Sequence, residues 1–582
     1  MVSDPIYLIS CYDPWRTKLV MTDACYWHFC FSPIGVTVGD GVRIFGFSEF
    51  LSVVALLTVV YTIADVRYKF RIAVTPGALY RSTFFLLSII GVESLLSELW
   101  IAEGWYVPVS AEWFTYTIWQ TIFGFLFLST FLTWMYYAFI RPPIYGRSNA
   151  KRFATELYRY ILRGSEDELS VIANELARSA KSLVLNSAQA RVSTRQGKSK
   201  KTNDDLSGFA HDILLLIGNR KFCRKIVENS PVTAQAFFED MVNEKRYGLP
   251  VGAFARNISS EAILQKGSFL YGEAEGYDSG LLGYLKPVSL AVYGNYRLLS
   301  SLERTHGSPF NIHFEEMWDW KPAHWKAYLH AASITLKNGL EDGDLSYASG
   351  PLREVFRNLE HPLMALHELD EMPDAYSAET FKVLQVIVRF VTDALDTLSK
   401  NSDKLPKSLK PNEHMKSIYD DLSDLIVQMC DNAASVKSPS EIAWSVQRNA
   451  IWGRFFGLSG EGEAWRIVQF KVRRALYDYV VSIEKLPNYQ NARVLGFCLN
   501  VLGLRVHDRK GYGKEAYPLA KSVQSWVRKN FAKLYSDFPD VAESALIGSI
   551  TYDSAKNRLV QTYGKSLGAP KGKEIYLELD VP

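Results

Sequence analysis

Three long apolar stretches near the start of the chain dominate its pattern of hydrophobic and polar positions. They cover about residues 44–66, 82–101 and 114–139. The hydrocarbon core of a bilayer is roughly 30 Å thick and needs about 20 helical residues, so each stretch is long enough to cross it. The sequence therefore predicts a three-helix transmembrane region over 44–140, preceded by an external or interfacial N-terminal segment over 1–43.

The segment 19–38 allows a second interpretation. It reads LVMTDACYWHFCFSPIGVTV and is apolar enough to insert as a fourth span, which would place the N-terminus inside. The aspartate, histidine and proline within it argue against a lipid-facing helix, so we favour a position outside the membrane. An external position would permit a disulfide among Cys11, Cys25 and Cys30, with one cysteine left over.

Beyond residue 140 apolar positions recur every three or four residues, which is typical of amphipathic helices. Ser165 and Glu168 form a capping-box pattern at the start of one helix, and Ser230 followed by Pro231 marks the start of another. Further helices are expected over about 205–218, 377–400, 413–435, 440–456, 463–485 and 514–534. Because no strict repeat period runs through them, we expect a mainly α chain with a solenoid-like or irregular helical array.

The end of the chain has a different period. Residues on both sides of a turn at 554–557 resemble two short strands, and KEIYLELD close to the C-terminus alternates between polar and apolar positions, which predicts a small β element. Polar linkers, the longest of them at 187–206, interrupt the helical pattern. We therefore expect a cytoplasmic helical domain over 141–400 and a C-terminal helical region over 401–582 that ends in a small sheet.

Charges beside the spans predict their orientation. The loop between the first two spans carries four basic residues, and the segment after the third span carries four more. The loop between the second and third spans, AEGWYVPVSAE, carries none. Basic flanks stay on the cytoplasmic side, so we expect a protein of the plasma (inner) membrane with its N-terminus outside and residues 141–582 in the cytoplasm.

Glu93 is the residue of this region that is energetically most expensive to place in a membrane. It lies near the middle of the second apolar stretch, STFFLLSIIGVESLLSELW, about 15 Å from the inner end at ~1.5 Å per residue. A charge at that depth costs roughly 3 kcal/mol on insertion scales. The other two spans carry hydroxyl groups but no Lys, Arg or His at the same depth, so one chain offers no ion pair.

Two interpretations of the intramembrane polar residues stay open. In the first, several subunits bring together a cation or proton path, which gives a candidate set of Glu93, Ser94, Ser97, Glu98 and Gln120. In the second, the carboxyl group of Glu93 only joins helices through a hydrogen bond. Because three spans alone make a poor pore, the first interpretation requires a homo-oligomer.

Charge and cysteine content narrow the functional classes. The net charge of the whole chain is +3, which is too mild to indicate a nucleic-acid-binding protein. Six cysteines in 582 residues are too few for a disulfide framework. Cys223, Cys430 and Cys498 are expected to be buried thiols in a reducing compartment.

No catalytic or cofactor signature is found in the sequence. The string GKS at 197–199 lacks the first glycine of a phosphate loop, because Val192 stands in that place. The string HELDE at 367–371 lacks the spacing that puts two histidines on one face of a helix. We expect neither a resident cofactor nor a metal. A membrane-bound enzyme whose site is assembled from distant residues stays an alternative.

Two aromatic segments are candidates for binding a ligand or a partner. The segment 314–330, FEEMWDWKPAHWKAYLH, sets aromatic rings beside basic residues, and 270–297 mixes glycine with tyrosine. Such rings can stack on a base or nucleotide, although core packing is their commoner role. The candidate residues are Trp318, Trp320, Trp325, Tyr277 and Tyr284.

These features predict an oligomeric integral membrane protein with a cytoplasmic helical sensor domain. The sensor is expected to regulate a transmembrane ion path or a membrane-effector activity, for instance in bacterial defence. The expected partners are the lipid bilayer, further copies of the chain, and a cytoplasmic protein or nucleotide ligand; nucleic acid is not expected. The alternatives are a membrane-anchored scaffold without transport and the membrane-bound enzyme.

Overall fold

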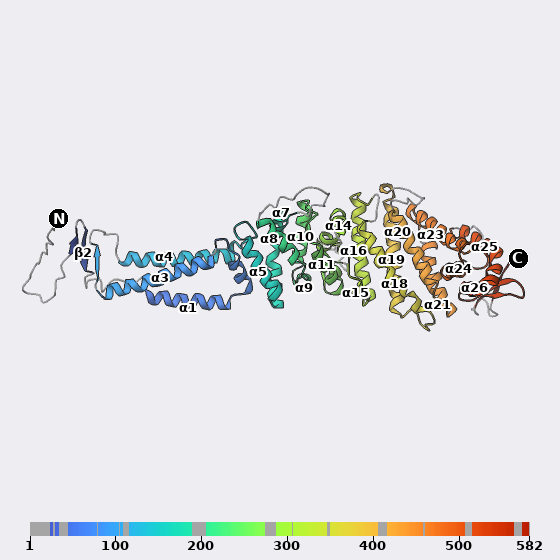
Figure 1. Cartoon of the computed structure of the whole chain (residues 1–582), viewed down its shortest axis with the longest axis horizontal. Helices are drawn as coiled ribbons and strands as arrows, with labels where there is room; N and C mark the ends of the chain where they lie inside the picture. Colours follow the sequence, from blue (N-terminus) through green and yellow to red (C-terminus); the bar gives the residue numbers. More distant parts are fainter. Residues whose placement is uncertain are drawn as a thin grey trace, which may run out of the picture. The chain divides into compact units, whose positions relative to one another are not determined.

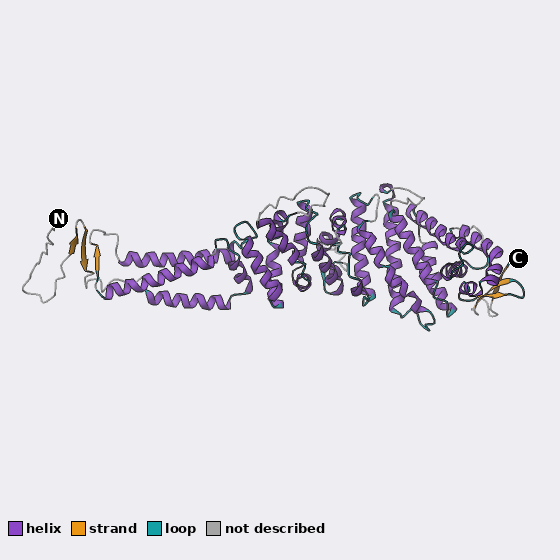
Figure 2. Ribbon diagram, in the orientation of Figure 1, coloured by secondary structure: helices purple, strands orange, loops and turns teal. Residues whose placement is uncertain are grey.

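The computed structural model of the chain is mostly helical, with a three-stranded sheet near each end of the sequence (Figure 2). The chain divides into two compact units. The N-terminal unit comprises 1–187 and 199–213, and the C-terminal unit comprises 188–198 and 214–582. The structure describes residues 24–26, 29–33, 45–77, 79–103, 105–108, 116–188, 205–273, 287–304, 307–345, 350–405, 416–457, 460–506, 515–563 and 573–580.

The N-terminal unit combines apolar helices, a small sheet and a group of shorter helices. Its elements are β1 (Ala24–Tyr26), β2 (Phe29–Pro33), α1 (Phe47–Ile63), α2 (Val66–Ala73), α3 (Leu79–Ala102), β3 (Tyr106–Pro108), α4 (Tyr116–Met135), the π-helical turn η2 (Tyr136–Ile140), α5 (Ala150–Arg163), α6 (Glu166–Ala177), α7 (Ala180–Asn186) and α8 (Asp205–Leu216).

Two or three of these helices could cross a membrane. The stretches Arg81–Ala102 and Thr117–Ile140 are each long and apolar enough by themselves, whereas α1 passes the same test only together with α2. The bend between α1 and α2 is 110°, and Asp65 explains it. Its carboxylate accepts a hydrogen bond from the backbone N–H of Arg67 at 3.1 Å and so caps a new helix. The helix of the first predicted span is therefore 17 residues long.

Close packing of α1, α3 and α4 places the three helices side by side (Figure 1). Their common core consists of Phe50, Ile90, Phe123 and Phe127. Gly91 in α3 makes this approach possible, because a Cβ at that position would lie 2.7 Å from the ring of Phe50. In membranes, small residues at helix interfaces usually allow the helix backbones to approach one another closely.

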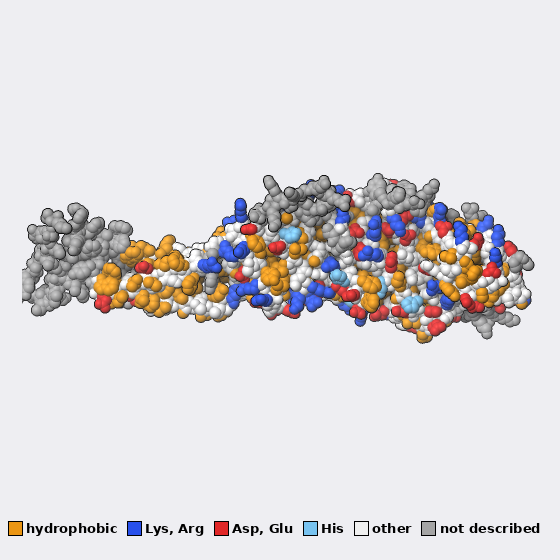
Figure 3. All heavy atoms as spheres, in the orientation of Figure 1, with side chains coloured by type: hydrophobic (Ala, Val, Ile, Leu, Met, Phe, Trp, Pro, Cys, Tyr) orange, Lys and Arg blue, Asp and Glu red, His pale blue; other side chains and the backbone are white. Residues whose placement is uncertain are grey.

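The outer surface of these helices is apolar, as the hydrophobic side chains that gather over them in Figure 3 show. Leu56, Ile63, Phe84, Phe85 and Phe125 are all more than half exposed. In water an apolar surface of this kind would favour aggregation, whereas a lipid bilayer accommodates it. The surface therefore fits a membrane protein.

The N-terminal hairpin lies at the same end of the helices as the α3–α4 connection. Strands β1 and β2 are antiparallel with Cys25 opposite Cys30, and β2 pairs with β3, which sets Phe31 opposite Pro108. The described part of 19–38 thus forms strands and not the helix of a fourth span. Opposite Cα atoms in antiparallel strands lie about 4.5–5.5 Å apart, a separation that a disulfide allows. The disulfide itself stays a prediction.

The C-terminal unit is a succession of helices that follow one another in chain order and end in a sheet (Figure 1). Its elements are α9 (Arg220–Asn229), α10 (Pro231–Asn243), α11 (Gly252–Leu264), α12 (Phe269–Gly272), α13 (Pro287–Tyr293), α14 (Tyr296–Glu303), α15 (Phe314–Met317), α16 (Pro322–Glu341), α17 (Pro351–Asn358), α18 (Glu360–Met364), η3 (Ala365–Leu369), α19 (Glu379–Lys400), η4 (Ser402–Lys404), α20 (Ile418–Ala433), α21 (Ser440–Trp444), η5 (Ser445–Trp452), α22 (Gly453–Phe456), α23 (Glu463–Ser482), α24 (Tyr489–Leu502), α25 (Tyr517–Asp537), α26 (Pro539–Ser544), β4 (Ile550–Asp553), β5 (Arg558–Tyr563) and β6 (Lys573–Glu578).

The helical pattern and the C-terminal sheet predicted from the sequence are confirmed. Strands β4, β5 and β6 pair antiparallel in chain order. The capping box of α6 is present, with the Ser165 backbone N–H donating to Glu168 Oε2 at 2.8 Å. At α10 the helix starts at Pro231 as predicted, but the Ser230 hydroxyl bonds to the hydroxyl of Thr233 at 2.8 Å and not to a backbone N–H.

The three cysteines of the C-terminal unit are free and buried, as expected. Burial raises the pKa of each thiol: well above its usual range for Cys223 and Cys430, and to about 12 for Cys498. A thiol that stays protonated is a poor nucleophile and a poor metal ligand. These cysteines therefore act as small apolar core residues.

Candidate functional site

Glu93 lies near the middle of α3 and on the outer face of the helix bundle. Its side chain is exposed, whereas that of the next residue, Ser94, is only 1% exposed and faces the bundle interior. Among the residues that the structure describes, Glu93 has no hydrogen-bond or ion-pair partner. A carboxylate at mid-span that points away from its own bundle requires a partner, water or protonation from outside the chain.

Glu98 has a partner that no sequence pattern indicated. Its Oε1 accepts a hydrogen bond from the backbone N–H of Phe47 at 2.8 Å, while Glu49 Oε2 accepts one from the N–H of Gly46 at 2.9 Å. The first N–H groups of a helix have no acceptor within the helix, and negative charge is favourable beside them. Glu98 therefore caps α1 from α3, which gives this carboxylate a structural role.

The five predicted polar residues do not converge on a single point within one chain. Ser97 donates from its hydroxyl to the backbone carbonyl of Ser94 at 2.8 Å, within its own helix. Gln120 in α4 is buried, as Ser94 is. Inside one chain the buried members thus face the bundle core, whereas Glu93 faces outward and has no partner within the described ranges.

A buried ion pair joins α2 to α6. The Arg71 guanidinium donates from Nε and Nη2 to the two carboxylate oxygens of Glu175 at 2.8 and 2.7 Å. The two side chains are 7% and 5% exposed, and Arg67 Nε lies 3.4 Å from the same carboxylate. Two parallel N–H···O bonds are the strongest arrangement available to this pair. Since both charges are buried, removing either side chain would leave the other charge buried without a partner, which strongly destabilises a fold.

The same guanidinium satisfies a carbonyl group that two prolines leave without a donor. Arg71 Nη1 donates to the backbone oxygen of Ala138 at 2.6 Å, in the π-helical turn η2. In an α-helix this carbonyl would accept from the N–H of residue 142, and in a π-helix from that of residue 143. Both positions are proline and have no N–H. Arg71 thus ties the end of α4 to α2 and α6.

Asn149 makes a second buried connection close by. Its Nδ2 donates to the backbone oxygens of Val74 at 2.8 Å and Ile144 at 3.0 Å, and its Oδ1 accepts from the N–H of Gly146 at 2.8 Å. We call Arg71, Glu175 and Asn149 the polar joint. The polar joint connects the ends of α2 and α4 to α5 and α6 through buried hydrogen bonds.

The polar joint was not anticipated from the sequence. The signal for it was present in the two consecutive prolines after the third apolar stretch, which must orphan carbonyl groups of the preceding turn. The identity of the donor could not be inferred, because Arg71 lies 67 residues before Ala138 and one of several basic residues could have taken this place.

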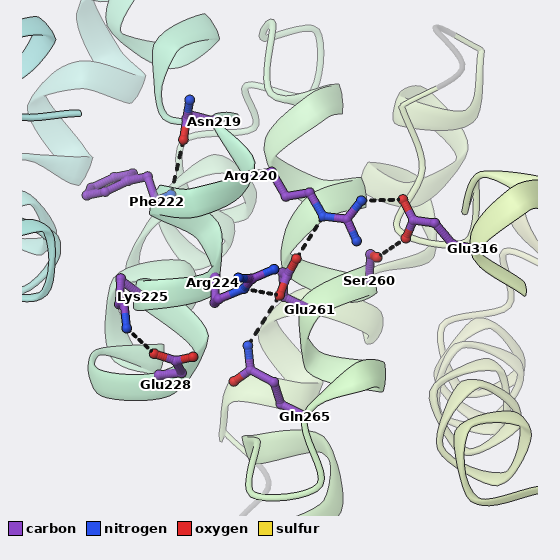
Figure 4. A network of polar contacts seen from close by, with 10 residues as sticks. All are labelled: Asn219, Arg220, Phe222, Arg224, Lys225, Glu228, Ser260, Glu261, Gln265 and Glu316. Carbon is purple, nitrogen blue, oxygen red and sulfur yellow. Dashed lines mark hydrogen bonds and ion pairs between the residues drawn. The ribbon is translucent and has the colours of Figure 1, made fainter. Parts of the chain in front are cut away.

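The C-terminal unit contains its own buried carboxylate, Glu261 in α11 (Figure 4). Arg220 Nε and Arg224 Nε, both in α9, donate to its two oxygens at 2.8 and 3.0 Å. Arg220 also donates to Glu316 of α15 at 2.8 Å, so one arginine bridges three helices. Burial tends to raise the pKa of Glu261, but the hydrogen bonds from the two arginines outweigh it and the net pKa is lowered.

The predicted aromatic candidates have different surroundings. Trp320 and Trp325 are buried and pack edge to face against Tyr328, with ring centroids 5.4 and 6.0 Å away. Trp318 is 65% exposed and stacks on His361 at 6.0 Å. Of the three tryptophans, only Trp318 is therefore accessible to a partner. Tyr277 and Tyr284 lie outside the described residues.

In the part of the chain that the structure describes, no group of three or more His, Cys, Asp or Glu side chains is arranged to hold a metal ion. The chain matches no family model, no curated protein and no solved structure in the comparisons made.

Proposed function

We propose that the chain is an oligomeric integral membrane protein in which a cytoplasmic helical domain regulates an ion path or a membrane-effector activity. The single observation that carries the proposal is the position of Glu93. It is exposed at the middle of an apolar helix and has no partner among the described residues. A second copy of the chain can supply a partner or enclose a water-filled space around the carboxylate, whereas lipid can do neither.

The proposed topology has the N-terminus outside and residues 141–582 in the cytoplasm. The pairing of β2 with β3 supports a common side for the hairpin and the α3–α4 connection. The contact of Arg71 with Glu175 supports a common side for α2 and α6. Basic flanks at α2 and after α4 favour the cytoplasm for this second side.

The polar joint is the proposed point at which regulation reaches the membrane. Helices α5 and α6 belong to the same compact unit as α3 and α4. A ligand or partner that binds the solenoid-like C-terminal helices would act through the chain on α5 and α6, and the polar joint would pass the movement to the ends of α2 and α4. A buried, fully hydrogen-bonded ion pair suits this role, because it has few intermediate arrangements.

Ion flux through liposomes tests the proposal. Wild type is compared with Glu93→Gln and with the control Glu103→Gln, which removes a carboxylate just beyond the end of α3. We expect flux from the wild type and the control, and a loss or altered selectivity in Glu93→Gln with the oligomer intact. Equal flux from all three would remove Glu93 from any conduction path.

A membrane-anchored scaffold is the second candidate, and the exposed rings of Trp318 and Phe314 favour it. Exposed aromatic side chains are typical anchors of protein interfaces. The scaffold predicts that Glu93→Leu is tolerated, whereas the ion path predicts that it abolishes flux. The same liposome measurement therefore separates the two candidates.

A further inference from the structure

A large pocket lies beside the ends of α1 and α3, within the N-terminal unit. Its volume is about 980 Å³, and its walls come from α1, α2, α3, α5 and α6. Arg81, which lines it, is the first residue of the candidate span Arg81–Ala102. The pocket therefore opens at the depth where an inserted α3 meets the lipid headgroups.

Positive charge dominates the walls of the pocket. Five cationic side chains line it against two carboxylates, which leaves a net charge of +3. Both carboxylates are engaged by the protein itself. Glu156 pairs with Arg159 at 2.7 Å, and Glu168 accepts the N–H of Ser165 in the capping box. In Figure 3 the Lys and Arg side chains gather beside the apolar helices.

The other four cationic side chains have N–H donors that no carboxylate among the described residues accepts. Lys69 and Arg152 donate to the backbone oxygens of Thr62 and Ser148, at 3.3 and 3.2 Å, and neither has a carboxylate partner among the described residues. Within the same described part, Arg81 and Arg163 have no ion-pair partner either. Guanidinium groups without a carboxylate are the usual ligands of phosphate oxygens, which they bind through two parallel N–H···O bonds.

Part of the lining of the pocket is apolar. Tyr61, Ile72 and Leu79 supply this part, from α1, α2 and α3. A ligand that fills the pocket should therefore join a phosphate group to a hydrocarbon part. A free phosphate would leave these apolar side chains uncovered, whereas a phospholipid places its phosphate on the arginines and its glycerol and first methylenes along the helices.

We infer that this pocket binds the phosphate-bearing headgroup of an anionic phospholipid. Basic pockets beside the ends of membrane helices are known to suit this chemistry. The inference rests on the membrane position in the proposed function and not on ion conduction. A lipid bound there would touch both α3 and α5 and would connect the membrane surface to the helices held by the polar joint.

The test uses the full chain in the uncharged detergent dodecyl maltoside, without any flux measurement. The melting temperature is followed as dioleoyl phosphatidylglycerol or dioleoyl phosphatidylcholine is added. The double variant Arg81→Gln/Arg163→Gln removes two pocket cations, and Arg147→Gln/Lys151→Gln removes two exposed cations of the same region that do not line the pocket. Both variants change the net charge by the same amount.

We expect phosphatidylglycerol, but not phosphatidylcholine, to raise the melting temperature of the wild type and of the control variant. The pocket variant should need at least about tenfold more phosphatidylglycerol for the same rise in melting temperature. The reason is that each basic residue near an anionic lipid surface adds to the attraction, and this variant lacks two of them. An equal loss in both variants would overturn the pocket and indicate diffuse attraction. Inorganic phosphate that gives the same rise and displaces the lipid would overturn the lipid assignment. Failure of the liposome flux test would change neither result.

Discussion

Individual carboxylates of the apolar helices differ in how far the sequence reveals their surroundings. The cost of Glu93 follows from its depth alone, because a charge at mid-membrane is expensive in any helix. The direction in which it points could not be predicted, since α3 is apolar on every side and no stripe marks the face that packs. The capping role of Glu98 could not be predicted either, because its partner, the N–H of Phe47, is 51 residues earlier in the chain.

Removing one member of the buried Arg71–Glu175 pair should be costly. Arg71→Met leaves a buried carboxylate and the Ala138 carbonyl without their main donor, and we expect a loss of about 3 kcal/mol or more in the free energy of unfolding. The double variant Arg71→Met/Glu175→Leu should recover part of the lost free energy of unfolding. A loss of about 1–3 kcal/mol should remain, because the Ala138 carbonyl still lacks a donor. Chemical denaturation in detergent measures both.

The matched control for this pair is Arg389→Met. Arg389 lies 3.9 Å from Asp393 on the surface of α19, and both side chains are mostly exposed. An exposed pair of this kind should cost less than about 1 kcal/mol. If Arg71→Met were no more destabilising than Arg389→Met, the pair would not hold α2 and α6 together.

Glu261 should make the stability of the C-terminal unit depend on pH in the acid range. Its folded pKa is lowered, so the folded state holds the charged form more strongly than the unfolded chain does. The resulting stability is present above the usual range of a glutamate, about pH 4.3, and is lost as the pH falls through the folded pKa. Melting curves from pH 7 to 3 measure this loss.

The variant Glu261→Gln removes this pH dependence. At neutral pH it should be less stable than the wild type by about 1–3 kcal/mol, a moderate figure because the two arginines are half exposed and stay hydrated. The difference should shrink towards pH 3. The control Glu228→Gln, which breaks a pair with Lys225 within one helix, should show little change; a constant difference for Glu261→Gln at every pH would contradict the assignment.

Helices were predicted more fully than their connections. Apolar periodicity and caps are local properties, so the start of α6 and the N-terminal proline of α10 were found from the sequence. The bend between α1 and α2 was missed, because the apolar run continues through residue 66 and only the cap at Asp65 ends the helix. The pairing of β2 with β3 joins segments more than 70 residues apart, which no local pattern encodes.

The packing of α3 against α1 depends on the absence of a side chain at Gly91. Gly91→Ala should lower the melting temperature, although alanine is the better helix former, because its Cβ would lie 2.7 Å from the Phe50 ring. Overpacking of this kind costs about 1–3 kcal/mol. The control Gly208→Ala in α8 meets no atom within 4 Å and should be neutral or stabilising. A stabilised Gly91→Ala would show that the two helices do not approach so closely.

At the scale of the whole molecule, the apolar helices share one compact unit with the first helices that follow them. Residues 141–187 belong with α1 to α4 in one compact unit, and the polar linker at 187–206 lies close to the division between the two units. The sequence predicted one helical domain over 141–400, and its boundaries at 141 and 401 stay predictions. Contacts between distant residues, Arg71 with Glu175 above all, hold α2 to α6 within this unit.

The most direct test of the account is whether Glu93 faces a second copy of the chain. Glu93→Cys and Ser94→Cys are compared in membranes, in a chain whose three N-terminal cysteines are replaced by serine and whose three buried cysteines are kept. The two positions are neighbours at the same depth, but Ser94 is buried in its own bundle. Oxidation should join two chains covalently through Glu93→Cys and should leave Ser94→Cys monomeric. Equal cross-linking of the two variants, or none from Glu93→Cys, would contradict the claim.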